Sequence, residues 1–395
     1  MIFADFHIHS RFARGTSKNI TLDNLERFAR VKGLNLLGTG DFTHPKWFAE
    51  LKSNLTEDGS GILKSKTGFK FVLQTEISLI YKQGGRVRKV HLLVLAPSFD
   101  IVSQISDELL KFGRLDYDGR PIFGMPAYEF VEIMHSISPD IEVIPAHIWT
   151  PWFSLFGSHS GFDSIEDCFQ DKTKYIHALE TGLSSDPQMN WTISALDKFT
   201  LVSNSDAHSM FPFRLGRECN VFNFKQDFTY KDVLNAIRFK KNFVMTLEVN
   251  PSFGKYYFDG HRSCKFSADP RKHISVCPVC GKELTFGVLH RVLELADRPF
   301  GYKPKDALPF KHLLPLQELI ATFLGVGIQT KKVNIIYDKL ISVFGSEFNV
   351  LLDADAQALS KVVGKSLADL IILNREDKLN IIPGYDGVYG RIKLI

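Results

Sequence analysis

Short apolar runs alternate with amphipathic segments along the first half of the chain. Residues 21–32 begin at Thr21, a good helix N-cap, and place Leu22 and Ala29 on one face, so we expect a helix there. Residues 127–137 show the same spacing. The alternation of strand-length apolar runs with such helices predicts parallel strands joined by crossover helices. The expected strands span 2–6, 34–39, 69–75, 89–95, 142–146, 176–180 and 200–205.

The chain is long enough for one large domain and one or two smaller ones. It has 395 residues, of which 44% are hydrophobic, so we expect ordered cores and no extensive disorder. The pattern predicts an α/β domain over 1–253, a small module over 254–300 and a helical region over 301–395. The elements expected within the helical region are helices at 314–324, 332–344 and 359–373 and a final strand at 390–395.

Histidines and carboxylates follow or lie within most of the apolar runs. In a parallel barrel the loops after the strands meet at one rim, so these side chains are expected to converge there. Imidazole nitrogen and carboxylate oxygen together suit divalent cations. The sequence therefore predicts a multi-metal hydrolase. The candidate ligands and catalytic residues are His7, His9, Asp41, His44, Glu76, His91, His147, Asp206 and His208.

These candidates differ in how specific they are. Asp206-Ala207-His208 is the strongest motif, because it ends an apolar run with two ligand types two residues apart. A single His-x-His pair is weak by itself, since both side chains of an extended segment simply share a face. Glu76 lies in an apolar run, where a bound cation would offset the cost of burial and a salt bridge is the alternative.

A second cluster of candidate ligands lies in the small module. His261 and Cys264 are followed by Cys277-Pro-Val-Cys280, and two close ligand pairs joined by a short insert indicate a structural zinc site. His273 and His290 are alternatives to His261 as the fourth ligand. The two further cysteines lie far from this cluster in sequence and are expected to be buried fillers.

Several motifs of this chain resemble the PHP phosphoesterase superfamily and, within it, the endonuclease Q family. The resemblance covers nearly the whole chain. It implies a distorted seven-stranded β/α barrel of the TIM-like kind, a small zinc-binding module and a C-terminal helical DNA-binding region. The motifs are His-Ile-His-Ser at 7–10, Thr-Gly-Asp-Phe-Thr-His-Pro at 39–45, Gln-Thr-Glu-Ile-Ser at 74–78, Ser-Asp-Ala-His-Ser at 205–209 and Pro-Gly-Tyr-Asp-Gly-Val-Tyr-Gly at 383–390.

The resemblance also implies an activity. Such an enzyme would repair DNA by cutting the phosphodiester bond on the 5′ side of deoxyuridine, deoxyinosine, deoxyxanthosine or an abasic site. It would use a di- or trinuclear centre of zinc, manganese or magnesium, with one structural zinc elsewhere. The three implied ligand sets are His7, His9, Glu76 and Asp206; Glu76, His91 and His147; and His208 with Asp41 or His44.

Substrate contacts are expected from loops after the strands. Arg11 and Arg14 follow the first strand and are candidates to meet the DNA backbone, with ordinary solvation as the alternative. Trp149, Trp152 and Phe153 follow a candidate ligand. They are candidates for a wedge or for the pocket wall at an extruded nucleotide, with loop packing as the alternative.

Charge and targeting signals narrow the possible classes of protein only slightly. The net charge is +4, but residues 255–312 hold eleven Lys and Arg against six Asp and Glu, which is compatible with contact to a phosphate backbone. Neither a secretory leader nor a membrane-length apolar run is visible, so we expect a cytoplasmic monomer without membrane contact. Gly364-Lys365-Ser366 lacks the first glycine of a P-loop, because Leu359 stands there, so no nucleotide cofactor is expected.

Two alternatives to a nuclease remain open at this point. A PHP-type phosphatase acting on a small monoester would use the same ligands but leaves the zinc module and the following residues without a role. A non-catalytic PHP protein that only binds DNA would be expected to have gaps in its ligand set. A replication or repair protein could be a further partner, but no clamp-binding peptide is evident in the sequence.

Overall fold

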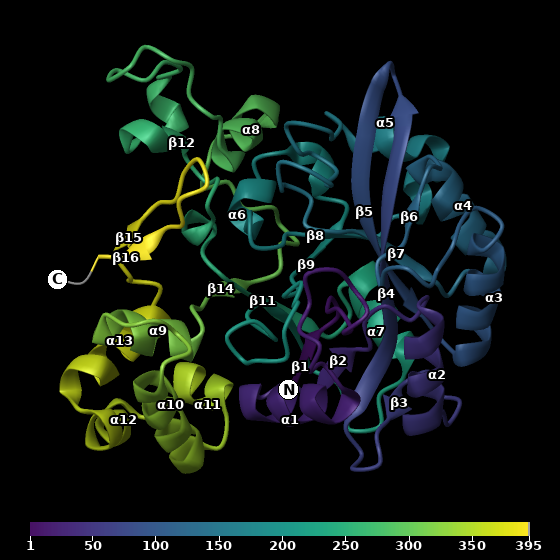
Figure 1. The fold of residues 1–395 in the computed structure, drawn as a ribbon, viewed down its shortest axis with the longest axis horizontal. Coiled ribbons are helices and arrows are strands. Elements are labelled where there is room, and N and C mark those ends of the chain that lie inside the picture. Colours follow the sequence, from purple (N-terminus) through teal and green to yellow (C-terminus); the bar gives the residue numbers. More distant parts are fainter. Residues whose placement is uncertain (394–395) are drawn as a thin grey trace.

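A computed structural model describes residues 1–393 and shows one large curled sheet surrounded by helices (Figure 1). The strands of this sheet are β1 Ile2–Asp5, β2 Leu36–Gly38, β3 Leu63–Lys64, β4 Lys70–Gln83, β5 Arg86–Ala96, β6 Ile122–Phe123, β7 Glu142–Pro145, β10 Cys219–Phe222, β11 Phe243–Glu248 and β14 Phe310–His312. Their order is β14-β11-β10-β1-β2-β4-β5-β7, with β3 and β6 paired to β4. The architecture is mixed α/β with a curled, half-barrel sheet.

A separate pair of strands continues the curl of the sheet. β8 (Ala178–Glu180) and β9 (Thr200–Val202) pair in parallel, and β8 lies against β7. Just beyond β9, a parallel bridge between Ala207 and Ile8 brings the chain back beside β1. The seven apolar runs of the sequence thus coincide with β1, β2, β4, β5, β7, β8 and β9.

The expectation that these strands are all parallel is wrong for β5. β1, β2 and β4 are parallel, but β5 is antiparallel to both β4 and β7. The reason is the turn at Gly84 and Gly85, whose φ angles of 58° and 73° suit a two-residue hairpin. Glu76 and His91 therefore lie inside long paired strands and not at strand ends.

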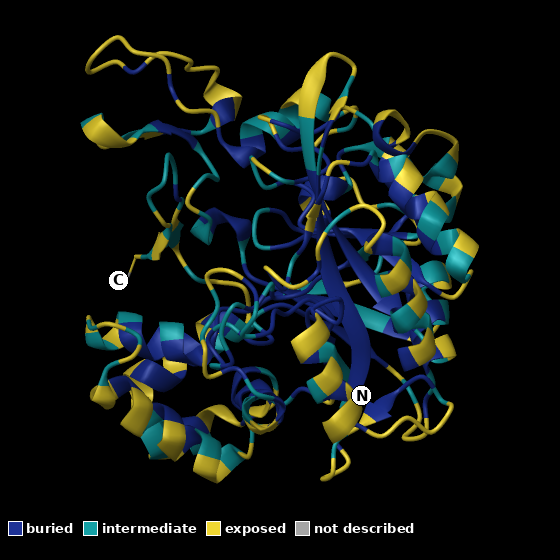
Figure 2. Cartoon of the chain, turned by 45° about the vertical axis from the view of Figure 1, so that its right-hand side comes forward, coloured by how far each residue is buried: buried dark blue, intermediate teal, exposed yellow. Residues whose placement is uncertain are grey.

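Amphipathic helices cover the outside of the sheet. Thr21 caps the first helix, since its hydroxyl oxygen accepts a hydrogen bond from the N–H of Asn24 at 3.2 Å. The strands of the large sheet are mostly buried apart from the tip of the β4–β5 hairpin, whereas the outer helices keep an exposed face (Figure 2). The helices of this part are α1 Leu22–Lys32, α2 Pro45–Asn54, α3 Phe99–Leu109, α4 Ala127–Ile137, α5 Ile165–Phe169, α6 Pro187–Asn190 and α7 Tyr230–Phe239.

The remaining elements form a small module, a helical region and a hairpin between them (Figure 1). Those of the module are β12 Asp259–His261, β13 Phe266–Ala268 and α8 Val288–Leu295. Those that follow are α9 Leu316–Leu324, α10 Lys331–Phe344, α11 Glu347–Leu352, α12 Ala356–Val363, α13 Lys365–Arg375, β15 Ile381–Ile382 and β16 Arg391–Ile392. The single helix expected over 359–373 is two helices, because Gly364 between α12 and α13 has a φ of 81°. The strand expected at 390–395 is β16, and residues 394–395 lie outside the described part.

Buried polar contacts join the helical region to the sheet. Lys32 of α1 reaches Glu347 of α11 at 2.8 Å, and both side chains are almost completely buried. β14 pairs with β11, so a segment assigned to the helical region also extends the sheet. The division of the chain at 253 and 300 stays a prediction. Within residues 1–393, no helix has the length and apolarity that crossing a membrane requires.

His312 of β14 links three segments. Its two ring nitrogens lie 3.1 Å from an Asp186 oxygen and 2.9 Å from an Asp377 oxygen. Burial lowers the pKa of His312, but these two carboxylates outweigh burial and raise the pKa to about 10. The histidine is therefore positively charged near neutral pH and holds the end of α13 to the barrel.

We expect this link to make stability depend on pH. A histidine whose pKa is raised by folding stabilises the fold fully below its unfolded pKa of about 6.5, and that contribution is lost as the pH rises toward the folded value. The Tm should therefore fall between about pH 6.5 and pH 10, and the fall should be smaller in His312→Asn. Thermal unfolding followed by circular dichroism measures both, with the exposed His159→Asn as control. Equal pH slopes in His312→Asn and wild type would contradict this role.

Candidate metal centre

Four side chains form the first ligand group. Ligand atoms of His7, His9, Glu76 and Asp206 all lie within 4.8 Å of one another. His9 Nε2 is 3.1 Å from Glu76 Oε2 and 3.2 Å from Asp206 Oδ1. His7 Nε2, His9 Nε2 and Asp206 Oδ1 are buried and have no hydrogen-bond partner. Unpaired buried polar atoms that face one another are what a bound cation would satisfy, so these residues fit a metal ion.

Glu76 connects this group to a second one. Its Oε1 lies 2.7 Å from His91 Nδ1 and 3.1 Å from His147 Nε2, and these three residues form a group of their own. Its Oε2 faces His7 and His9. One carboxylate thus presents one oxygen to each group, which is the arrangement of a ligand that bridges two ions.

Two further carboxylates orient the histidines of the first group. Asp41 Oδ1 is 2.9 Å from His9 Nδ1, and Glu180 lies 3.0 Å from His7 Nδ1. A carboxylate on Nδ1 leaves Nε2 free for a cation and fixes the ring. The φ angles of Asp41, His147 and Asp206 are 39°, 32° and 47°, a conformation that is costly for residues other than glycine. Strain of this kind is concentrated at functional sites.

The implied third ligand set is not brought together among the described residues. Asp41 uses its oxygens on His9 and on the backbone N–H and hydroxyl of Ser10. His44 is almost completely buried and stacks on Phe12 with 4.3 Å between ring centroids. His208 lies beside the first group, where its Nδ1 donates to the Asp206 carbonyl at 3.0 Å. Asp41 is therefore placed as a support for His9, and a third ion stays a prediction.

The electrostatics of the rim favour bound cations. Burial lowers the pKa of His7, but the charges of Glu180, Glu76 and Asp206 outweigh it and raise that pKa well above its usual value. Burial raises the pKa of Glu76, whereas His91 and Arg120 lower it well below its usual value. The carboxylates thus stay ionised and draw positive charge into a buried site, which divalent ions can supply.

Two residues of the site escaped the sequence analysis. Glu180 ends β8, so the rule used for the other strands could have found it. Arg120 donates from Nη1 to Glu76 Oε2 at 2.9 Å, but it lies in a loop without periodicity and gave no signal. Gly119 lets that loop approach, because a Cβ there would clash with the carboxylate of Asp41.

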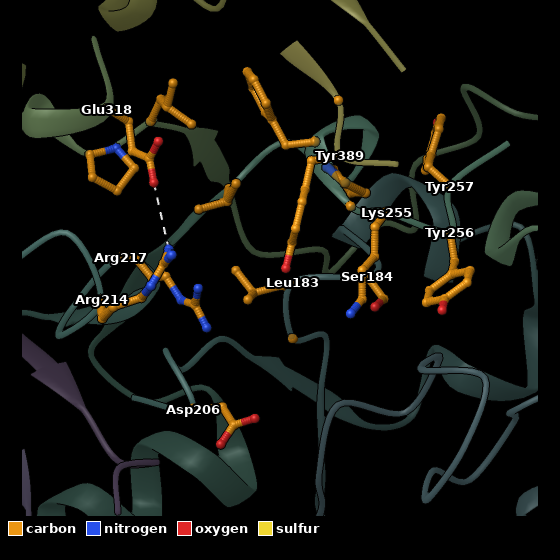
Figure 3. A pocket seen from close by; sticks show the side chains of 18 of the residues that line it. Leu183, Ser184, Asp206, Arg214, Arg217, Lys255, Tyr256, Tyr257, Glu318 and Tyr389 are labelled. Carbon is orange, nitrogen blue, oxygen red and sulfur yellow. Dashed lines mark ion pairs between the residues drawn. The ribbon is translucent and has the colours of Figure 1, made fainter. Parts of the chain in front are cut away.

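The metal rim opens into a cavity of about 1000 Å³ (Figure 3). His91, His147, Asp206 and His208 line one end of the cavity, together with Arg120. The rest of the wall comes from the loops after β7, β8 and β9, the small module, α9 and the C-terminal hairpin. A substrate larger than a small molecule can therefore reach the rim.

The predicted substrate-contact residues fall into two groups. Trp152 and Phe153 line the cavity, as expected. Trp149 is 1% exposed and donates its Nε1–H to Asn190, so it belongs to the core and does not line the cavity. Arg11 pairs with Glu50, and Arg14 lies on the surface beside Asp118, so both are also outside the cavity wall.

A further candidate metal site lies in the small module. His261, Cys264, Cys277 and Cys280 bring their ligand atoms within 4.8 Å of one another. Desolvation raises the pKa of the Cys277 thiol, but hydrogen bonds from backbone N–H groups and from His261 outweigh it and lower the pKa to about 6. Of the alternative fourth ligands, His290 pairs with Asp259 at 2.8 Å, and His273 lies outside the cluster. Three thiols and one imidazole suit zinc.

The curled sheet and its histidine and carboxylate rim define a metal-dependent hydrolase. Two solved structures match the whole chain at 34% identity. The lesion-specific endonuclease PfuEndoQ of Pyrococcus furiosus has a TM-score of 0.89, with 95% of its chain covered. An endonuclease Q complex with a 27-mer duplex that has an abasic lesion at the active site has a TM-score of 0.88, with 96% covered. The chain belongs to the endonuclease Q family of metal-dependent endonucleases.

Two curated proteins also match this chain in sequence. The uncharacterized protein YqxK of Bacillus subtilis is 31% identical over 99% of both chains. The uncharacterized protein MJ0043 of Methanocaldococcus jannaschii is 38% identical over 62% of this chain, which spans 31% of that relative's length. Residues 315–378 match the family of the MJ0043 C-terminal domain.

We expect Cys280→Ser to lose the structural zinc alone. The serine hydroxyl is a poor replacement for a thiolate, so metal analysis by mass spectrometry should show about one equivalent of zinc less. The control is Cys168→Ala, which removes a buried thiol far from the cluster and should keep the full zinc content. A Cys280→Ser protein with unchanged zinc content would contradict the assignment.

Proposed function

We propose that this protein is a DNA repair endonuclease that cuts on the 5′ side of a damaged nucleotide. The substrates would be a deaminated base, namely deoxyuridine, deoxyinosine or deoxyxanthosine, or an abasic site. The observation that carries the proposal is the full-length match to an endonuclease Q whose solved complex has a lesion-containing duplex at the active site. The complete ligand groups beside a large cavity support it.

The chain's own residues prepare the rim for hydrolysis. Glu76 presents one oxygen to each histidine group, and Asp41 and Glu180 hold His9 and His7 with Nε2 directed inward. Two divalent ions held in these groups, with His208 beside them for a third, would supply an activated water and balance the charge on the phosphate. Because the ligands are mainly imidazoles and carboxylates, zinc or manganese suits them better than magnesium.

Arg120 is the protein group best placed to hold the scissile phosphate. It lines the cavity and is hydrogen-bonded to the carboxylate that joins the two ligand groups. Its charge cannot be removed by deprotonation, and its planar group pairs with phosphate oxygens. Cations in both groups would repel Arg120, and the negative charge of a bound phosphate would compensate for that repulsion.

The remainder of the cavity would receive the damaged nucleotide. A base inside a duplex cannot reach a buried rim, so the nucleotide must be turned out of the stack and held in a pocket. Trp152 and Phe153 provide aromatic surface for this at the cavity wall. The basic module and the Gly-linked helices α9 and α10 would hold the duplex outside the cavity through phosphate contacts.

The first test is a nicking assay on a labelled duplex with one deoxyinosine or deoxyuridine and manganese or magnesium. Wild-type protein should cut just 5′ of the lesion. Asp206→Ala removes a ligand of the first group and should reduce the rate by at least about 100-fold, more than loss of an outer-shell partner usually does. No cleavage by folded, metal-loaded protein that releases phosphate from small monoesters would favour a phosphatase. A folded protein that binds the duplex and shows neither activity would favour a non-catalytic role.

Removal of the Arg120 side-chain charge should slow cleavage without loss of metal. We expect Arg120→Met to lower kcat roughly 10- to 100-fold, which corresponds to loss of a charge-assisted hydrogen bond of about 1.5–3 kcal/mol. Arg120→Lys should recover part of the rate. The control is Arg114→Met in the same loop, whose exposed guanidinium pairs with Asp116 and not with the ligand groups. Metal content that falls together with the rate would instead make Arg120 a support for Glu76.

A further inference from the structure

The C-terminal hairpin at the cavity is firmly attached to the segment 252–255, where the sheet domain meets the small module. We define the cavity hairpin as residues 384–390, between β15 and β16. The N–H groups of Gly384, Gly387 and Gly390 donate to backbone carbonyls of residues 252, 255 and 253 at 2.8, 2.7 and 3.0 Å. The ring of Tyr385 packs on Gly260, where a Cβ would clash with it. The backbone of the cavity hairpin therefore has little freedom.

Tyr389 is nevertheless exposed on this rigid support. Its side chain lines the cavity, yet the residue is 70% exposed, between the anchored Gly387 and Gly390. Lys255 Nζ lies 5.8 Å from the Tyr389 ring and 5.7 Å from the Tyr256 ring. Figure 3 shows Tyr389, Lys255 and Tyr256 on the side of the cavity away from Asp206. An exposed aromatic ring on an anchored backbone has lost most of its entropy before it meets a ligand.

The opposite side of the cavity is basic. Arg217 donates from Nε and Nη2 to the carbonyl of Ser205 at 3.0 and 2.9 Å, beside the ligand Asp206. Arg214 lies 3.5 Å from Glu318 of α9, and Figure 3 shows this pair beside Arg217. Positive charge near the rim suits phosphate, whereas an aromatic ring with a lysine beside it suits the flat face of a nucleobase.

The exposure of Tyr389 decides which base it can meet. A ring that is 70% exposed does not wall a closed pocket, whereas Tyr257, which also lines the cavity, is only partly exposed. Because Tyr389 both lines the cavity and is exposed, its ring is open to contact by a duplex that delivers one nucleotide into the cavity. Extrusion leaves a gap in the stack, and proteins commonly fill such gaps with an apolar or aromatic side chain.

We propose that Tyr389 is a stacking wedge, which enters the duplex in place of the extruded nucleotide and stacks on the base pair left exposed. The ligand of this site is the flat face of a base pair in duplex DNA. The proposal rests on the proposed function, because it requires that a nucleotide be turned into the cavity. The proposal gives the cavity hairpin a role in nucleotide extrusion, which the candidate metal ligands do not provide.

The test compares the same lesion in duplex and in single-stranded DNA. Loss of one base-stacking contact typically reduces binding by roughly 10- to 100-fold. Tyr389→Ala should therefore lower kcat/KM by about that factor on the duplex, with little change on the single strand, where no stack needs filling. Tyr389→Phe should retain duplex activity. The control is Tyr302→Ala, a half-exposed tyrosine that packs against Arg298 outside the cavity.

A fluorescence measurement separates the wedge from the cleavage activity. 2-Aminopurine placed at the target position in place of the damaged base should brighten less when Tyr389→Ala binds the duplex than when wild type binds, because without the wedge the base leaves the stack less often. Unchanged cleavage of the duplex by Tyr389→Ala would overturn the wedge, and so would an equal loss on both substrates, which would indicate stacking on the extruded base. If wild type does not cut at all, the proposed function fails. Equal 2-aminopurine fluorescence with wild type and with Tyr389→Ala would overturn the wedge whatever the cleavage result.

Discussion

The structure depends on the burial of one carboxylate, Glu76, in the middle of the sheet. A negative charge without water is tolerated only where compensating groups surround it, and here each comes from a different part of the fold. His9 follows β1, His91 lies on β5, and Arg120 comes from a loop that can approach because Gly119 has no side chain. The need to neutralise this carboxylate is thus the common reason for the position of the rim residues.

The β4–β5 hairpin places the two candidate ion positions next to each other, on either side of Glu76. Because Gly84 and Gly85 reverse the chain, β5 returns antiparallel and pairs Ser78 with His91, two residues from Glu76. One oxygen of Glu76 then faces β1 and the other faces β5 and β7. A parallel crossover would have carried β5 in the other direction, and His91 would not have reached Glu76. The antiparallel strand that departs from the expected pattern is therefore what brings the second ligand group to the first.

The cavity is a product of the whole chain. Its basic side belongs to the sheet domain, its aromatic side to the small module and the cavity hairpin, and α9 closes it. The hairpin returns after the helical region to hydrogen-bond with residues 252–255, more than a hundred positions earlier in the chain. Buried contacts such as Lys32 with Glu347 and His312 with Asp186 hold these parts in place. The candidate metal ligands of the rim thus come from the sheet domain, whereas much of the cavity wall comes from other parts of the chain that pack against it.

The sequence by itself determined β1, β2, β4, β5, β7, β8 and β9, but not β10 and β11 of the same fold. It also determined the helices at 22–32 and 127–137 and the candidate residues of both ligand groups and the zinc cluster. Local periodicity, caps and ligand chemistry are properties of neighbouring residues, so a single chain displays them. Only the tertiary structure decided that Asp41 supports His9, that Trp149 is buried, and that Glu180, Arg120 and Tyr389 belong to the site. These facts depend on contacts between residues 32 to more than 170 positions apart. The direction of a strand, the burial of a side chain and its partners are set by packing and hydrogen bonding between distant segments. No local sequence pattern encodes these contacts.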